Sequence, residues 1–210
     1  MDIIPFDKIL EPDIIETIIK WLDGSGILIY PTDTLYGIGG HYMDPSVHDQ
    51  IDRIKGRGPM PYSMCVSDVQ MLAAMTTGLP AEHLPMIQKL LPGKFTFLME
   101  ASDAIPKDLL KGHNSVGLRI PKVPSLLELI KISQTPLITT SVNRSGQPPL
   151  NNPVDIIREF NAERILLLDA GILPPSKGST IVDLTSTIPK LIREGDDVAL
   201  LNELKFITNQ

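Results

Sequence analysis

The chain has 210 residues, of which 42% are hydrophobic and 21% are charged, and it carries a formal net charge of −6. These proportions are typical of a globular protein and exclude a disordered or collagen-like chain. Its single cysteine, Cys65, excludes an internal disulfide and any zinc site built on several thiolates. The net negative charge argues against a surface that binds phosphate everywhere, but a local basic groove is compatible with it.

Three features predict a soluble protein of the cytoplasm. No apolar run approaches the length of a membrane span, so no membrane partner is expected. The first 13 residues hold four acids and no basic stretch before an apolar run, unlike a secretory signal. One cysteine fits a reducing compartment. The length favours one domain, residues 1–210.

Helices and strands are expected to alternate along most of the chain. In the first helix, residues 12–22, isoleucine and leucine recur at helical spacing. Pro12 suits the first turn of this helix, and Gly24 suits its end. The other expected helices cover residues 46–54, 69–75, 81–91, 125–133 and 153–160, with a helical turn at 106–111. The expected strands cover residues 27–30, 62–66, 94–100, 115–121, 136–141, 165–169, 179–184 and 190–194.

The order of these elements favours an α/β fold with a twisted mixed sheet and flanking helices. Several strands follow one another near the C-terminus, so the pattern is not that of a fully parallel sheet. The glycine-rich GIGG, residues 37–40, is interpreted as a turn after the first strand. The C-terminal run 196–206 is interpreted as a short helix or a tail. The four histidines show no ligand spacing and are expected on the surface.

Polar side chains gather where the expected strands begin or end. They lie in PTDTLYG (31–37), PKVP (121–124), TTSVNRSG (139–146) and STIVD (179–183). Ligands bind at strand ends in open α/β sheets, so one pocket could collect these groups. The cationic candidates are Lys55, Arg57, Arg119 and Arg193. Both Arg119 and Arg193 interrupt apolar strand patterns, where a charge is costly unless an anion meets it.

Each of these features also has a simpler interpretation. A single charge is more often a solvated group or part of a structural ion pair, and TDT alone could be a turn. No G-x-x-x-x-G-K-[ST] loop occurs, and GIGGHY lacks the third glycine of the dinucleotide fingerprint. Bound phosphates would therefore be held by scattered side chains and backbone amides.

Seven segments, taken in order, resemble the motifs of the YrdC/TsaC family of threonylcarbamoyl-AMP synthases. They are PTDTLYG, IKGR, PGKFTFLM, SVGLRIP, TTSVNRSG, STIVDLT and LIREG, and they span about residues 26–195. The resemblance implies a YrdC-like domain with a basic concave face, in the short form that lacks an extra C-terminal domain. It also implies that L-threonine, bicarbonate and ATP with Mg²⁺ become threonylcarbamoyl-AMP and pyrophosphate, for the t6A modification of tRNA at position 37.

The resemblance assigns roles by motif position. L-threonine would contact Thr34, Arg119, Thr139 and Ser179. ATP would contact Lys55, Arg57, Ser115, Ser141, Asn143 and Arg193, and Lys55 and Arg57 would also act in catalysis beside the triphosphate. An arginine suits the substrate carboxylate because its planar fork can donate two parallel hydrogen bonds. No protein metal site is implied, since phosphates and water would hold Mg²⁺.

Two other functions stay open. The same basic face could bind double-stranded RNA or tRNA through phosphates, largely by shape. The segments PYSMCVSD and PGKFTFLMEAS resemble the YciO branch, whose members would bind nucleotide with weak or no synthase activity. If the chain is a synthase, its adenylate product would pass to the downstream t6A transferase machinery.

Overall fold

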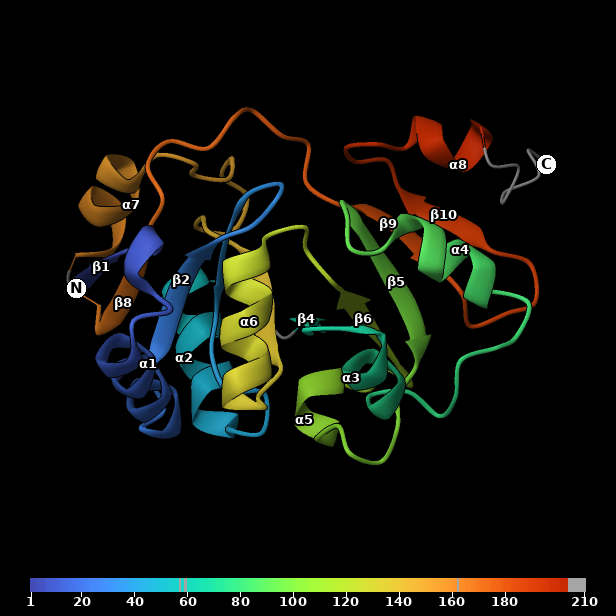
Figure 1. Ribbon diagram of the computed structural model, residues 1–210, viewed down its shortest axis with the longest axis horizontal. Helices are drawn as coiled ribbons and strands as arrows, with labels where there is room; N and C mark the ends of the chain where they lie inside the picture. The colour runs from blue at the N-terminus through green and yellow to red at the C-terminus, as the bar shows by residue number, and fades with distance from the viewer. Residues whose placement is uncertain (57, 59, 162, 204–210) are drawn as a thin grey trace.

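The computed structural model describes residues 1–56, 58, 60–161 and 163–203. In these residues ten strands form one sheet in the order β1-β8-β2-β3-β7-β4-β6-β5-β9-β10 (Figure 1). The strands are β1 (Asp2–Pro5), β2 (Ile27–Pro31), β3 (Tyr36–Gly39), β4 (Ser63–Cys65), β5 (Phe95–Glu100), β6 (Ser115–Arg119), β7 (Leu137–Ser141), β8 (Ile165–Asp169), β9 (Thr180–Asp183) and β10 (Lys190–Arg193).

Proline and side-chain caps begin several of the helices. The helices are α1 (Pro12–Asp23), α2 (Pro45–Lys55), α3 (Val69–Ala74), α4 (Leu84–Leu90), α5 (Lys107–Leu110), α6 (Pro124–Ser133), α7 (Pro153–Phe160) and α8 (Ala199–Glu203), with a 3₁₀ turn at Phe6–Lys8. Asp44 and Asn152 cap α2 and α7 by accepting hydrogen bonds from Ser46 N and Val154 N. No helix in the described ranges is long and apolar enough to cross a membrane.

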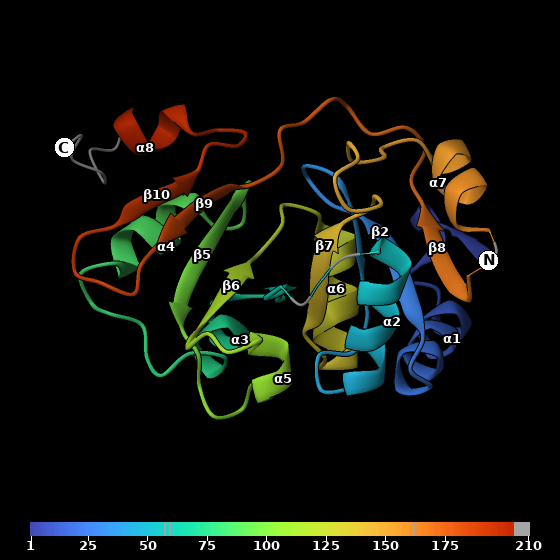
Figure 2. The ribbon, with the colours of Figure 1, turned by 180° about the vertical axis from the view of Figure 1, so that it is seen from behind.

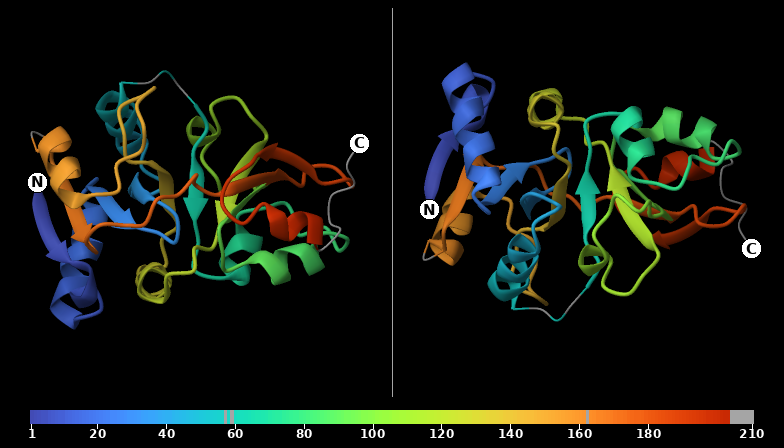
Figure 3. Two further views of the ribbon diagram at one scale, coloured as in Figure 1. Left: turned by 90° about the horizontal axis from the view of Figure 1, so that it is seen from above. Right: turned by 90° about the horizontal axis from the view of Figure 1, so that it is seen from below.

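The two faces of the sheet carry separate hydrophobic cores. In β2, Ile27 and Ile29 pack on one face, and Leu28 and Tyr30 pack on the other. This alternation follows from the two-residue period of a strand, and both sets are apolar because helices cover both faces. The core with Leu28 and Tyr30 includes residues of α1 and α6, while the other includes residues of α2 and α7. Figure 3 shows α2 and α6 on opposite sides of the sheet.

The expected mixed sheet is confirmed. β8 pairs in parallel with β1 and β2, whereas β3 pairs antiparallel with β2 and β7. β7 joins the half of the sheet that holds β2 and β8 to the half that holds β5 and β9 (Figure 2). Its pairing with β4 ends at Thr139, and Thr140 and Ser141 continue beside β3. The sheet therefore opens next to the last residues of β7.

The interpretation of GIGG as a turn is wrong, because Tyr36–Gly39 forms strand β3. A Cβ on Gly39 would lie 1.7 Å from the carbonyl oxygen of Ile138, so glycine here serves close approach of β7. The N-terminal strand β1 was not expected either. The C-terminal run does contain a short helix, α8. The single domain of 1–210 and the basic concave face stay predictions.

The surface location expected for all four histidines is wrong for two of them. His48 and His83 are buried. The Nδ1 of His48 lies 2.7 Å from the Asp108 carboxylate, and its Nε2 lies 3.0 Å from the carbonyl oxygen of Tyr42. The Nε2 of His83 lies 2.8 Å from the carbonyl oxygen of Ser186. Burial is tolerated because these ring nitrogens have hydrogen-bond partners.

Gly39→Ala tests the contact between β3 and β7. The added Cβ would overlap the Ile138 carbonyl, and we expect a loss of about 1–3 kcal/mol, or roughly 2–12 °C in melting temperature. Gly58→Ala is the matched control, because a Cβ at Gly58 would meet nothing within 4 Å. Equal melting temperatures for the two variants in a circular dichroism melt would contradict this account.

Candidate active site

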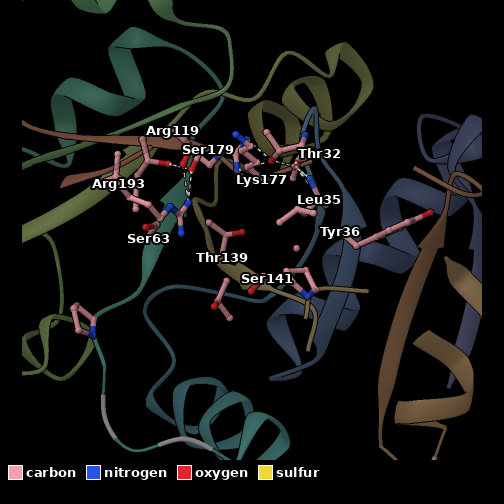
Figure 4. A pocket seen from close by; sticks show the side chains of 18 residues that line it. Thr32, Leu35, Tyr36, Ser63, Arg119, Thr139, Ser141, Lys177, Ser179 and Arg193 are labelled. Atoms are coloured by element: carbon pink, nitrogen blue, oxygen red, sulfur yellow. Dashed lines mark hydrogen bonds between the residues drawn. The ribbon is translucent and has the colours of Figure 1, made fainter. Parts of the chain in front are cut away.

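A cavity of about 210 Å³ opens where β7 leaves β4. Its walls come from the β2–β3 turn, from the five strands β3, β4, β5, β6 and β7, from the segment before β9, and from strands β9 and β10 (Figure 4). The volume is below the range of about 300–1,000 Å³ that drug-sized ligands occupy. The cavity therefore suits a small metabolite, or one part of a larger ligand.

The turn between β2 and β3 is shaped by Thr32. Its hydroxyl donates to the carbonyl oxygen of Leu35 at 2.7 Å and accepts from the backbone N–H groups of Thr34 and Leu35. The Thr32 and Thr34 hydroxyl oxygens are 3.0 Å apart. Such side-chain to backbone bonds explain why the strand ends in threonines, since they replace the ladder bonds that stop at Pro31. The turn holds the Thr34 hydroxyl at the cavity.

Arg119, the last residue of β6, is buried and forms an ion pair with Asp33. Its Nη2 donates to Asp33 Oδ1 at 2.6 Å, and both Nη atoms lie within 3.4 Å of the Thr34 hydroxyl. The other Asp33 oxygen accepts from the Lys122 backbone N–H. The Nε of Arg119 is buried without a hydrogen-bond partner in the described structure. Asp33 thus holds one edge of the guanidinium still.

A second guanidinium, that of Arg193 in β10, reaches the same cavity. Its Nη2 donates to the carbonyl oxygen of Ser179 at 2.7 Å and lies 3.3 Å from the Ser179 hydroxyl. That hydroxyl is also 2.8 Å from the Thr96 hydroxyl. Burial, and then the positive charge of Arg119, lower the pKa of Arg193.

The cavity carries an excess of positive charge. Arg119, Arg193 and Lys177 line it, and the lining residues in the described structure include no aspartate or glutamate. Asp33 balances only one of the three charges, from its position against Arg119. Like charges in a partly enclosed site favour an anionic ligand. Hydroxyl groups around them can orient that ligand by hydrogen bonds.

Lys55 lies behind the cavity and holds a loop in place. Its Nζ donates to the carbonyl oxygen of Ser141, to the carbonyl oxygen of Asn143 at 3.1 Å, and to Asn143 Oδ1 at 2.8 Å. The Ser141 hydroxyl also donates to Asn143 Oδ1. Lys55 is buried at the end of α2. In this structure it supports the 141–143 loop instead of lining the cavity.

The structure brings together six of the residues that the sequence analysis assigned. Thr34, Arg119, Thr139, Ser141, Ser179 and Arg193 all line the cavity. Asn143 and Lys55 contact Ser141 from behind. Ser115 begins β6 opposite Glu100, four residues and roughly 13 Å from Arg119, and does not line the cavity. Arg57 lies outside the described residues.

Among the lining residues that were not assigned a role from the sequence, five are threonine, serine or lysine. They are Thr32, Ser63, Thr96, Thr140 and Lys177. A Cβ on Gly117 would lie 2.5 Å from the Ser63 hydroxyl, so Gly117 gives that hydroxyl its room. For Lys177 a signal existed, because it stands two residues before Ser179 in SKGST. Thr32 and Thr140 stand in PTDTLYG and TTSVNRSG, the polar segments already noted in the sequence. Ser63 and Thr96 face the cavity because of strand register, which a single sequence does not reveal.

Comparison with known proteins points to one family. The family model for Sua5, YciO and YrdC, described as telomere recombination, matches residues 20–195. A threonylcarbamoyl-AMP synthase of Pyrococcus abyssi is 27% identical over 170 residues, which cover 80% of this chain and 50% of the relative. A Mycobacterium tuberculosis protein, given the same name provisionally, is 31% identical over 170 residues, with 80% and 78% covered. The chain thus spans half of the archaeal relative.

Solved structures share this fold. Pyrococcus abyssi Sua5 complexed with L-threonine superposes with a TM-score of 0.82 at 26% identity, covering 88% of this chain and 55% of that one. Escherichia coli YciO gives 0.81 at 23% identity, covering 88% and 90%, and this likeness concerns the fold alone. The family model matches most of the chain and the mycobacterial relative is 31% identical over 80% of it, so the chain belongs to the Sua5/YciO/YrdC family.

Proposed function

We propose that this protein is an L-threonylcarbamoyladenylate synthase, which makes threonylcarbamoyl-AMP and pyrophosphate from L-threonine, bicarbonate and ATP. One observation carries the proposal: residues from distant segments converge on one small cavity that combines unbalanced positive charge with many hydroxyl groups. The names of the matched relatives and the L-threonine complex of Pyrococcus abyssi Sua5 support it. We place the reaction in the cytoplasm, where its product would serve the t6A modification of tRNA.

L-threonine would lie in the cavity beside Arg119. The guanidinium would meet the substrate carboxylate, and its ion pair with Asp33 keeps it oriented before the substrate arrives. The hydroxyls of Thr34, Thr139 and Ser179 would satisfy the substrate hydroxyl. A site that hydrogen-bonds a substrate hydroxyl rejects analogues without it, because its own polar groups are then left unpaired.

The reaction has two bond-forming steps. The threonine amine combines with bicarbonate to give a carbamate, and one water molecule is released. A carbamate oxygen then attacks the α-phosphorus of ATP, and the bond between the α-phosphorus and the bridging oxygen breaks to release pyrophosphate. Charge develops on the transferred group and on the leaving oxygens, so fixed cations accelerate the step by electrostatic stabilisation.

ATP would extend from the cavity over the 141–147 segment, because 210 Å³ is too small for both substrates. Arg193, Ser141 and Asn143 would contact it, and Lys55 would keep Ser141 and Asn143 in position. Mg²⁺ would be held by the phosphates and water, since the described residues contain no cluster of three or more acidic, histidine or cysteine side chains that could hold a metal ion. It would supply charge neutralisation on the triphosphate.

Incubation of the purified protein with ATP, Mg²⁺, bicarbonate and an amino acid tests the proposal. We expect pyrophosphate release with L-threonine to exceed that with L-alanine at least about a hundredfold, because alanine leaves the hydroxyl partners unpaired. Release that is no faster with L-threonine than with alanine would refute the synthase. A steeply salt-dependent affinity for double-stranded RNA in the same preparation would then favour an RNA-binding function.

Arg119→Lys should impair use of L-threonine more than use of ATP. Lysine keeps a positive charge beside Asp33 but lacks the planar fork. We expect the KM for L-threonine to rise roughly tenfold to a hundredfold and the KM for ATP to change less. Arg158→Lys is the control, since its ion pair with Asp155 is exposed on α7. A larger change for ATP would reverse the assigned roles.

Lys55→Ala should show the opposite pattern. Removing the ammonium leaves the carbonyl oxygens of Ser141 and Asn143 without this donor and frees the loop that would contact ATP. We expect the KM for ATP to rise roughly tenfold, with a smaller change for L-threonine. Arg53→Ala, in the same helix with a side chain 71% exposed, is the matched control. An unchanged KM for ATP would exclude this supporting role.

A further inference from the structure

Residues 170–178, which follow β8 and precede Ser179 and β9, cross from one half of the sheet to the other (Figures 1 and 2). We call this stretch the crossing segment. It contains no helix or strand, yet its last residues, Lys177 and Gly178, line the cavity together with Ser179. Because it has no ladder or helix bonds of its own, other residues must hold it in place.

The first half of the sheet holds the start of the crossing segment. The Tyr36 hydroxyl accepts from the backbone N–H of Ala170 and donates to the carbonyl oxygen of Gly171, each at 2.9 Å. Burial raises the pKa of Tyr36 to about 12, so the hydroxyl keeps its proton at neutral pH. In Figure 4 its side chain points away from the two arginines. Asn151 bonds to both backbone groups of Leu173 further along.

One residue, Asp196, holds the far end. Its Oδ2 accepts from the Ser176 hydroxyl at 2.7 Å, and its Oδ1 accepts from the Lys177 backbone N–H at 3.0 Å. Its backbone N–H donates to the carbonyl oxygen of Gly178 at 2.8 Å, and its carbonyl oxygen accepts from the Thr180 hydroxyl at 2.7 Å. The backbone N–H, the backbone carbonyl oxygen and both carboxylate oxygens of Asp196 therefore bond to residues 176–180.

Ser176 links Asp196 to the backbone of Gly178. While it donates to Asp196, its oxygen accepts from the Gly178 backbone N–H at 2.9 Å. Gly178 has a φ of +83°, a conformation that glycine adopts without strain. A Cβ on Gly195 would lie 2.4 Å from the Gly178 carbonyl oxygen, so the chain around Asp196 can approach this closely only with glycine there.

The carboxylate of Asp196 is ionised at neutral pH. Partial burial alone would raise its pKa, but hydrogen bonds from Ser176 and the Lys177 N–H, together with the charges of Lys94 and Lys177, lower it. A carboxylate with a lowered folded-state pKa contributes stability above its unfolded pKa and loses that contribution only as pH falls through the folded value. The restraint is therefore fully formed at neutral pH.

We propose that Asp196 is a positioning residue of this site, which fixes residues 176–180 so that Lys177 and Ser179 present an ammonium and a hydroxyl to the anionic substrate. The identity of that substrate rests on the proposed function. Lys177 then becomes a third cation beside Arg119 and Arg193, held by a carboxylate that does not line the cavity. Asp196 bonds to the Lys177 backbone and lies outside the cavity lining, although the positive charge of Lys177 also acts on its carboxylate.

The neighbouring Asp197 provides a matched control. It lies 3.8 Å from the Lys94 ammonium, as Asp196 lies 3.7 Å from it, but no hydrogen bond joins its side chain to the crossing segment in the described structure. Its φ is +60°, which asparagine tolerates well. Asp197→Asn therefore removes the same charge at almost the same place and leaves the restraint intact.

The test measures KM, kcat and melting temperature for the full chain with L-threonine and ATP as probes. For Asp196→Ala we expect the KM for L-threonine to rise roughly tenfold with kcat within about twofold. Asp196→Asn should lose about threefold or less, because an amide oxygen can still accept from Lys177 N–H and its NH₂ can donate to Ser176. Asp197→Asn should match the wild type. The conservative variant Asp196→Asn keeps the test decisive even if Asp196→Ala fails to fold.

Ser176→Ala adds a test of the pathway. The Ser176 hydroxyl contributes through its bond to Asp196. The KM for L-threonine of the double variant Ser176→Ala with Asp196→Ala should therefore be no higher than that of Asp196→Ala alone, a non-additivity that independent sites do not show. Additive increases in the KM for L-threonine would refute a shared role of Ser176 and Asp196. Wild-type KM values in Asp196→Ala, or equal losses in Asp196→Ala and Asp197→Asn, would overturn the positioning role.

Amide hydrogen exchange separates this proposal from the proposed function. If the wild type releases no pyrophosphate, the synthase fails, and exchange at Lys177 and Gly178 still decides the role of Asp196. Faster exchange of these two amides in Asp196→Ala, but not in Asp197→Asn, would support it, since local opening exposes them. Unchanged protection in both variants would refute it.

Discussion

The buried ion pair between Arg119 and Asp33 is the interaction on which the site depends. It joins the end of β6 to the turn after β2, two elements on different sides of β7 in the sheet order. Burying a charge is costly, and the pair with its added hydrogen bonds offsets that cost. Removing one partner would leave a buried charge alone. The pair therefore connects the two halves of the sheet and sets the direction of the guanidinium.

Around this pair the fold gathers cations that have no carboxylate partner in the cavity wall. Arg193 arrives from β10 and Lys177 from the crossing segment, and both lie near hydroxyl groups. A chain with a net charge of −6 thus contains a local positive site, because charge position matters more than the sum. The sheet order explains the convergence, because each half of the sheet beside β7 combines strands from early and late parts of the chain.

Supporting residues in this molecule are as specific as the lining ones. Lys55 bonds to the Ser141–Asn143 loop, Tyr36 holds the start of the crossing segment, and Asp196 holds its end. Each makes at least two hydrogen bonds to backbone groups of these segments. Loops that carry functional groups are ordered in this way before the ligand binds, so the entropy cost of ordering them does not reduce the binding affinity.

Local patterns in the sequence determined most helices and strands here, because periodicity and capping act over a few residues: the apolar spacing of 12–22 and Pro12 predicted the helix that forms as α1. The ordered motifs also indicated the family and six of the residues that line the cavity. Only the tertiary structure showed that GIGG is a strand, that Lys55 supports a loop, that Ser115 lies far from Arg119, and that Asp196 restrains Lys177. Those facts depend on register and on contacts between segments distant in sequence, where packing overrides local preference.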